Sequence, residues 1–254
     1  MVNFTAVYVL WLREMKRYVR AKSRIISSLT MPFLFLVAMG FGFRNLNIPG
    51  LGNGTDYLSF LIPGIIGMGI MTSSLMAGLS ILWDREFGFL KEIMIAPVSR
   101  YSIVLGRVAG NVTTSIIQGL LIAVISIFLG FQISTIQALL LFFLVMILIS
   151  VSYVGLGLLL TSVIKDMQGF GSIMSLVMMP MVFLSGAFYP VNNLPGIIQL
   201  LSYLTPLTYG IDALRGIVIG ASIFNPITDI IILTIVSATL LTSGAVLFDK
   251  TESV

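Results

Sequence analysis

Six long apolar runs, separated by short charged or glycine-rich connections, dominate this chain of 254 residues. A helix needs roughly 20 consecutive apolar residues to cross the hydrocarbon core of a bilayer, and each run is about that long. The runs cover 25–43, 58–82, 108–131, 136–164, 170–189 and 229–248. Only 9% of the residues are charged and the mean hydropathy is +1.08. We therefore expect an all-α integral membrane protein of one domain, residues 1–254, with six transmembrane helices.

Lysine and arginine are distributed very unevenly over the connections. With the N-terminus inside, the inner connections hold twelve of these residues and the outer ones hold only Arg44 and Arg215. Basic residues concentrate on the cytoplasmic side of membrane proteins. The bias predicts a multi-pass protein of the cell (plasma) membrane with both termini in the cytoplasm.

Residues 1–24 combine an apolar stripe with a basic face. The stripe is Phe4, Val7, Tyr8, Trp11, Met15 and Tyr18, and the basic face is Arg13, Lys16, Arg17 and Arg20. This pattern predicts an interfacial helix whose basic face lies toward anionic lipid. The alternative is a plain basic flank of the first span. The segment is too charged for a cleaved signal peptide.

Residues 83–107 carry the densest charge in the chain: Asp84, Arg85, Glu86, Lys91, Glu92, Arg100 and Arg107. One charge at the bilayer centre costs about 2.5–3.5 kcal/mol, so this segment is expected in water or at the interface. Trp83, Phe87, Leu90 and Met94 recur at helical spacing. We expect a short amphipathic helix that Asp84 caps and Pro97 ends. A solvated loop that rests on lipid is the alternative.

Residues 190–228 are too interrupted to span a bilayer. Ile197, Leu200, Leu201 and Leu204 have helical spacing before Pro206, which predicts two short re-entrant helices that dip partway into the outer leaflet. Backbone at that depth is tolerated only against protein or a wet cavity. Asp212 and Arg215, at i and i+3, are expected to pair.

The composition excludes several kinds of chemistry. The chain has no Cys and no His, so disulfides, thiolate or imidazole metal ligands and a histidine base are excluded. No GxxxxGK[ST] phosphate loop is present. A net charge of only +4 gives no nucleic-acid surface. No run has a charge deep in its middle, which disfavours an ion-coupled carrier.

Two stretches together resemble a known family. The first offers Arg85, Glu86, Gly88, Leu90, Lys91, Pro97, Val98, Ser99, Arg100, Gly106 and Arg107. The second offers Leu184, Ser185, Gly186, Tyr189, Pro190, Leu194, Pro195, Pro206, Leu207, Tyr209 and Arg215. Both resemble motifs of type 2 ATP-binding-cassette (ABC) exporter permeases. Within that family the chain looks closest to the daunorubicin-resistance type of membrane subunit.

The resemblance implies a half-transporter without enzyme activity or cofactor of its own. A second permease copy or a paired sibling would complete the pathway, and a separate nucleotide-binding ATPase subunit would bind ATP and Mg. The coupling contacts with that subunit would come from Arg85, Glu86, Gly88, Phe89, Leu90, Lys91, Glu92, Pro97 and Arg100. Phe89 departs from the small polar residue of many relatives.

The same resemblance implies an outer gate and a transport path. Ser185, Gly186, Tyr189, Pro190, Pro195, Pro206, Tyr209 and Arg215 would form the outer gate. Met174, Met178 and Met181 of the fifth span are candidate pathway-lining residues, because methionine adapts to varied apolar cargo. Filling the bundle core is the alternative role of these methionines.

The function implied is multidrug-type efflux or other export of a hydrophobic or amphipathic cargo (drug, lipid or glycan). Two alternatives stay open: an ATPase-independent channel or secondary carrier, and a lipid-modifying membrane enzyme. The outer candidates for such an enzyme are Asp56, Asp212, Arg215 and Asp229, whose spacing matches no catalytic motif.

The charge bias makes the topology testable in this cysteine-free chain. Single cysteines at Asn53 and Asn193 should react with an impermeant maleimide in intact cells, whereas those at Ser99 and Ser253 should not. Labelling in permeabilised cells is the control for reactivity. The reverse pattern would contradict the predicted orientation.

Overall fold

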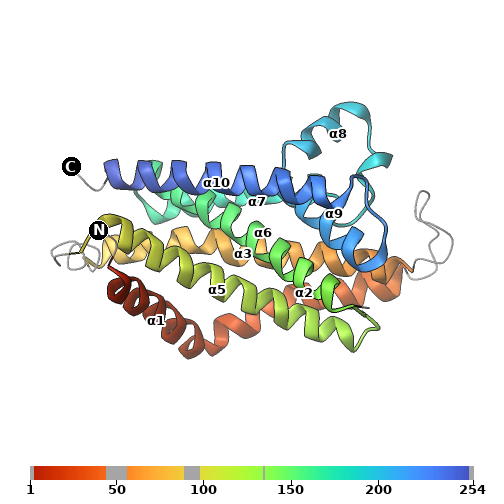
Figure 1. Ribbon diagram of the computed structural model, residues 1–254, viewed down its shortest axis with the longest axis horizontal. Helices are drawn as coiled ribbons and strands as arrows, with labels where there is room; N and C mark the ends of the chain where they lie inside the picture. The colour runs from red at the N-terminus through yellow and green to blue at the C-terminus, as the bar shows by residue number, and fades with distance from the viewer. Residues whose placement is uncertain (1–2, 44–55, 89–97, 134, 252–254) are drawn as a thin grey trace.

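The computed structural model describes residues 3–43, 56–88, 98–133 and 135–251, and these residues form helices joined by short connections (Figure 1). The helices are α1 (Phe4–Arg20), α2 (Lys22–Gly42), α3 (Tyr57–Glu86), α5 (Arg100–Ile127), α6 (Ile136–Val163), α7 (Met167–Leu184), η1 (Val191–Asn193), α8 (Gly196–Tyr203), α9 (Pro206–Ile219) and α10 (Pro226–Thr251). Six of them, α2, α3, α5, α6, α7 and α10, are long and apolar enough to cross a membrane. The predicted fold class is confirmed.

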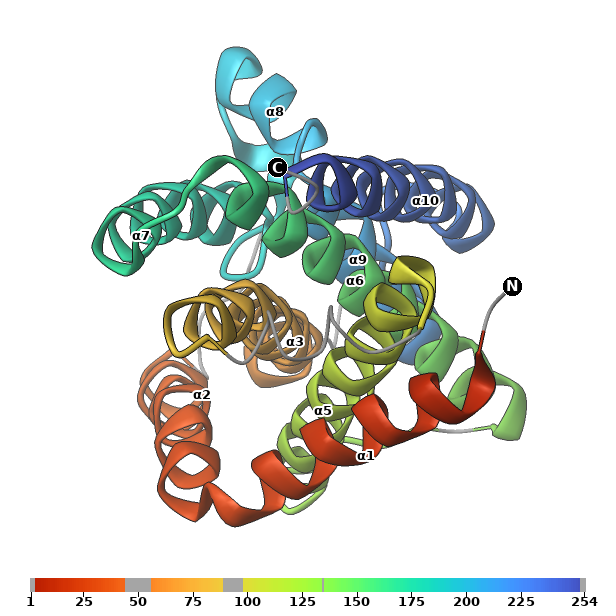
Figure 2. The same cartoon turned by 90° about the vertical axis from the view of Figure 1, so that its left-hand side faces the viewer.

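The six long helices run side by side along the long axis of the molecule, each opposite in direction to the one before it (Figure 1). At one end lie α1, the end of α3 and the start of α5, and we call this the charged end. At the opposite end, the far end, lie α9 and the short helix α8. The view along the axis shows α3 and α6 inside the bundle, with α1 crossing below α5 (Figure 2).

Small residues bring the central helices into close contact. A Cβ atom on Gly78 of α3 would lie 2.8 Å from the carbonyl oxygen of Gly157 on α6. Near this contact the hydroxyls of Ser74 and Ser150 are 3.0 Å apart and buried. Close packing and hydrogen bonds between spans are what hold helices together in lipid, where the hydrophobic effect gives no help. The small residues at this contact therefore act in packing.

The N-terminal segment forms the predicted helix, α1. The Asn3 side chain accepts hydrogen bonds from the backbone N–H groups of Thr5 and Ala6 and so caps its start. Only Ala21 separates α1 from α2, so the chain turns sharply from crossing the bundle to running along it (Figure 2). The position of α1 at a membrane surface stays a prediction.

Three predicted boundaries need correction. Asp84 does not cap a new helix, because it lies in the last turn of α3, which runs to Glu86. The third span begins at Arg100, so Arg107 lies within a helix rather than in a connection. The fifth helix ends at Leu184, before the predicted boundary at residue 189. The first two errors share a cause, because paired charges across helices are tolerated where isolated ones are not.

The packing of α6 on α10 gives a test of the fold. A Cβ on Gly155 would lie 2.7 Å from the backbone nitrogen of Leu241, and backbone cannot move aside as a side chain can. Gly155→Val should therefore destabilise the protein by about 1–3 kcal/mol, as overpacking does. The measurement is thermal unfolding in detergent. Gly171→Val, where nothing lies within 4 Å of the added Cβ, is the control and should unfold almost as wild type does.

Candidate functional site

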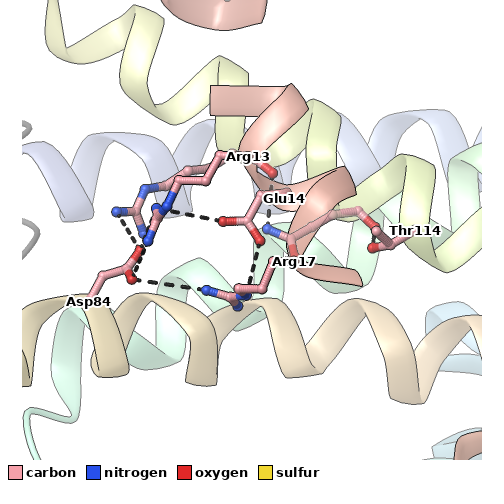
Figure 3. A network of polar contacts seen from close by, with 7 residues as sticks. Arg13, Glu14, Arg17, Asp84 and Thr114 are labelled. Carbon is pink, nitrogen blue, oxygen red and sulfur yellow. Dashed lines mark hydrogen bonds and ion pairs between the residues drawn. The ribbon is translucent and has the colours of Figure 1, made fainter. Parts of the chain in front are cut away.

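At the charged end a single carboxylate, that of Asp84 on α3, forms ion pairs with arginines of two other helices (Figure 3). Arg13 of α1 binds it in a bidentate manner, with Nη2 2.7 Å from Oδ1 and Nη1 3.0 Å from Oδ2. Nη2 of Arg107, on α5, lies 3.0 Å from Oδ2. Bidentate arginine–carboxylate pairs are among the strongest hydrogen-bonded contacts. Asp84 thus joins α1, α3 and α5 at one point.

A second carboxylate, Glu14, completes this charge network. Glu14 lies between two arginines of its own helix, 3.8 Å from Nη1 of Arg13 and 3.6 Å from Nε of Arg17. Nη1 of Arg17 also lies 3.9 Å from Asp84. We call Arg13, Glu14, Arg17, Asp84 and Arg107 the charge network. Its three arginines and two acids leave an excess of one positive charge.

Arg107 is the most deeply buried member of the network. Its side chain is 2% exposed, and its contact with Asp84 is an ion pair. None of its Nε, Nη1 and Nη2 atoms makes a hydrogen bond with the described residues. A buried charge is tolerated only when an opposite charge lies close by. Arg107 therefore depends on Asp84, and the pair fixes how α3 and α5 lie against each other.

Helix α1 is fastened to α5 along its length. At its start the backbone N–H of Asn3 donates to Oγ of Ser102, 2.8 Å away, in the first turn of α5. Further along, Nε1 of Trp11 donates to Oγ1 of Thr113 over 3.1 Å. Between them a Cβ on Gly106 would lie 2.8 Å from the side chain of Leu10. The close approach explains why Gly stands at 106.

The predicted coupling residues lie at the end of α3, at the start of α5 and in the connection between these helices. Nη1 of Arg85 donates to the carbonyl oxygen of Thr161 on α6, 3.3 Å away, whereas the Glu86 side chain is exposed. Gly88 has φ +75°, a left-handed conformation that favours glycine. Arg100 begins α5. Phe89, Leu90, Lys91, Glu92 and Pro97, and the helix expected there, lie outside the described residues.

The charge network was not expected from the sequence. Arg13 and Arg17 were expected on a face toward lipid, whereas both side chains turn toward Asp84 and Glu14. One signal was present, because Glu14 is the only acidic residue among six basic residues in positions 1–24. A lone acid inside a basic stripe indicates an ion pair rather than a lipid-facing surface.

At the far end Arg215 of α9 contacts two other parts of the chain. Its Nε donates to the carbonyl oxygen of Phe60 on α3 over 3.1 Å, and Nη2 donates to that of Ala187 over 2.9 Å. Its guanidinium lies 3.5 Å from the centroid of the Phe60 ring, a cation–π contact. Burial lowers the pKa of Arg215, and the charge of Asp212 opposes this shift. Arg215 fastens α9 to α3 and to the segment after α7.

The other predicted gate residues hold the chain where it turns between α7 and α9. Ser185 ends α7, with its hydroxyl 2.7 Å from the Val182 carbonyl oxygen, and Gly186 has φ +73°. The hydroxyls of Tyr189 and Tyr209 donate to the carbonyl oxygens of Phe183 and Tyr203. Pro190 and Pro195 precede η1 and α8, and Pro206 begins α9. The two predicted helices thus exist, and their re-entrant position and gating role stay predictions.

Asp212 and Arg215 bind different partners instead of forming the expected pair. Asp212 accepts hydrogen bonds of 2.9 Å from the backbone N–H groups of Ile223 and Phe224, which closes the turn from α9 to α10. Burial raises the pKa of the Asp212 carboxyl, and these two donors oppose the rise. Asp229 of α10 is fully buried, and its two carboxyl oxygens have no hydrogen-bond partner among the described residues.

The three candidate pathway-lining methionines face the bundle. Met174 is 3% exposed within the apolar core, and Met178 and Met181 pack partly buried against the same core. Their neighbour Met179 is 65% exposed. These positions agree with core filling, and a role in lining a path stays a prediction.

A comparison with protein-family models matches residues 5–219 to the ABC-2 type transporter family. This match spans both the charge network and the Arg215 contacts. The chain belongs to the ABC-2 type transporter family. The resemblance first noted from the two motif stretches is confirmed.

Several relatives of this ABC-2 chain are named as transport permeases. The transport permease ycf38 of Porphyra purpurea is 32% identical over 78% of this chain and 68% of its own length. The inner membrane transport permease YadH of Escherichia coli is 28% identical over 84% of this chain and 82% of its own. Nodulation protein J of Rhizobium meliloti is 29% identical over 81% and 78%. The chain is a multi-pass membrane transport permease.

The charge network gives a stability test. Asp84→Asn leaves Arg107 buried without a counter-charge, and breaking such a pair costs about 3–5 kcal/mol. Unfolding in detergent should show this loss, while Glu86→Gln at the neighbouring exposed position should change stability by about 0.5 kcal/mol or less. Adding Arg107→Met to Asp84→Asn should recover part of the loss, because the unpaired buried charge is gone. Equal stability of Asp84→Asn and wild type would contradict the assigned role of Asp84.

Proposed function

We propose that this ABC-2 permease is the membrane subunit of an ABC exporter driven by a separate nucleotide-binding ATPase subunit. The observation that carries the proposal is the charge network. It joins α1, α3 and α5 next to the connection where the family resemblance puts the ATPase contacts. A force on that connection would act on all three helices together, because α3 ends and α5 begins there.

The charged end is the cytoplasmic end in this proposal. The excess of lysine and arginine in the connections at this end supports that orientation. ATP and Mg would bind to the partner subunit, since no phosphate loop is present in this sequence. The Glu86 side chain is exposed at the end of α3, two residues before Gly88, whose backbone is left-handed. The charge of Glu86 would therefore be available to a partner.

A second permease copy, or a paired sibling, would complete the transport path. Large apolar side chains on α2 and α7 are exposed in the single chain, among them Phe33, Phe41, Leu176 and Met179. Lipid or a second subunit can cover such surfaces. The cargo in this proposal is hydrophobic or amphipathic, since exposed α7 offers methionine and leucine and no charged side chain.

The test is to purify tagged permease from native membranes and measure ATP hydrolysis by the subunit that co-purifies. Glu86→Lys should reduce the co-purified ATPase activity about tenfold, because a reversed charge at a contact costs ~1.4 kcal/mol or more. Lys165→Glu is the matched control, since it reverses an exposed charge in the connection between α6 and α7 at the same end.

The same preparation, stripped of its partner, should show no ATP hydrolysis. Nucleotide turnover by the permease alone would contradict a separate ATPase. If Glu86→Lys permease, expressed at the wild-type level, co-purifies the normal amount of ATPase, Glu86 is not part of the contact.

A further inference from the structure

A groove runs between α2 on one side and α3 and α5 on the other. Near the charged end it is lined by residues that include Arg17, Tyr18 and Arg24, and deeper by residues that include Met31 and Phe35. The two parts are continuous, because Ser28, Thr72 and Gln118 line both. The deeper part encloses about 220 Å³. We call it the α2 groove.

The lining changes in character along the α2 groove. Its mouth is cationic, its middle is polar with Ser28, Thr72 and Gln118, and its inner part is apolar with Met31 and Phe35. From Arg24 to Phe35 the helix rises about 16 Å at 1.5 Å per residue, close to half the roughly 30 Å thickness of the hydrocarbon core. The groove therefore has the length of one leaflet and the polarity profile of one lipid molecule.

The charge at the mouth favours an anionic headgroup. Glu14 also faces the groove, but Arg13 and Arg17 lie within 4 Å of its carboxylate and offset its charge. Arg24 adds a further positive charge, held with its guanidinium 6.0 Å from the centroid of the Trp83 ring. Basic residues at the membrane surface attract anionic lipid.

Tyr18 provides a second, independent observation that points to a ligand at the mouth. Its hydroxyl oxygen is buried and has no hydrogen-bond partner among the described residues, although Tyr18 lines the mouth. Burial raises the pKa of this hydroxyl, so it keeps its proton. A buried hydroxyl that lacks a partner is costly. A phosphate oxygen at the mouth would accept its hydrogen bond.

We propose that the α2 groove is a binding site for one phosphate-headed anionic lipid of the leaflet at the charged end. The headgroup contacts Arg17, Tyr18 and Arg24, and one acyl chain lies along Met31 and Phe35. The site lies within one chain and does not depend on the ATPase subunit or on the cargo. The lipid fills the space between α2 and its neighbours and so sets how far α2 stands from α3.

The experiment measures the lipid retained by purified protein. Delipidated permease is incubated with equal amounts of phosphatidylglycerol and phosphatidylcholine, and bound lipid is counted by native mass spectrometry. Wild type should retain one phosphatidylglycerol per chain in preference to phosphatidylcholine. Arg24→Gln should lower that preference about fivefold, the effect of one basic residue near the surface, and Tyr18→Phe should lower it less.

Lys22→Gln is the matched control, because Lys22 carries the same charge two residues from Arg24 and does not line the groove. The Lys22→Gln variant should prefer phosphatidylglycerol over phosphatidylcholine as strongly as wild type does. An equal loss in Lys22→Gln and Arg24→Gln would show only a general attraction to basic residues and would overturn the proposal.

A second pair of variants tests the depth of the site. Ser28→Trp fills the point where the two parts of the groove meet and should abolish retention, whereas Ile26→Trp, at a 67% exposed position outside the groove, should retain the lipid. Unfolding temperature shows that each variant is folded. Soluble glycerol phosphate should not displace the lipid, because the apolar part of the groove contributes to binding. Displacement by it, or full retention by folded Ser28→Trp, would overturn the proposal.

Discussion

The structure depends on one buried carboxylate, Asp84, because it is the point at which three helices meet. In the low dielectric of a membrane protein, a guanidinium such as that of Arg107 stays buried only if a counter-charge is held beside it. Arg13, from a helix that crosses the bundle, shares the same carboxylate. Ion pairs are directional and specific in their partners, so they fix a helix arrangement that apolar packing alone would leave free to slide.

The far end uses the opposite arrangement, a buried cation surrounded by backbone oxygens. Arg215 donates to carbonyl groups of α3 and of the segment after α7, and Asp212 accepts from backbone N–H groups after α9. The contacts with Ala187, Ile223 and Phe224 satisfy backbone groups that lie outside the helices. Buried backbone outside regular helices needs such partners. The aromatic hydroxyls of Tyr189 and Tyr209 serve the same purpose nearby.

Hydropathy and periodicity predicted most of the fold. The six spans, the N-terminal helix and the two short helices after α7 follow from the length of apolar runs and from helical spacing, which are local properties. The ends of helices were less predictable. A charge that ends a span when isolated can lie inside a helix when another helix supplies its partner, as at Asp84 and Arg107. Such pairings join residues far apart in the sequence, and no local pattern reveals them. The role of Arg215, which binds backbone rather than Asp212, was hidden for the same reason.

Helix α3 runs without interruption from the Arg215 contacts at the far end to Asp84 at the charged end. Phe60, which Arg215 contacts, and Asp84 lie on the same helix of 30 residues, about 36 Å apart at 1.5 Å per residue. A hydrogen-bonded helix bends more readily than it shortens or stretches, and Pro63 is the position where its ladder lacks a donor. A displacement of Asp84 along the axis of α3 would therefore move Phe60, and with it Arg215 and α9, by nearly the same distance. Helix α3 therefore holds the ion pairs of Asp84 and the contacts of Arg215 at a fixed distance from each other.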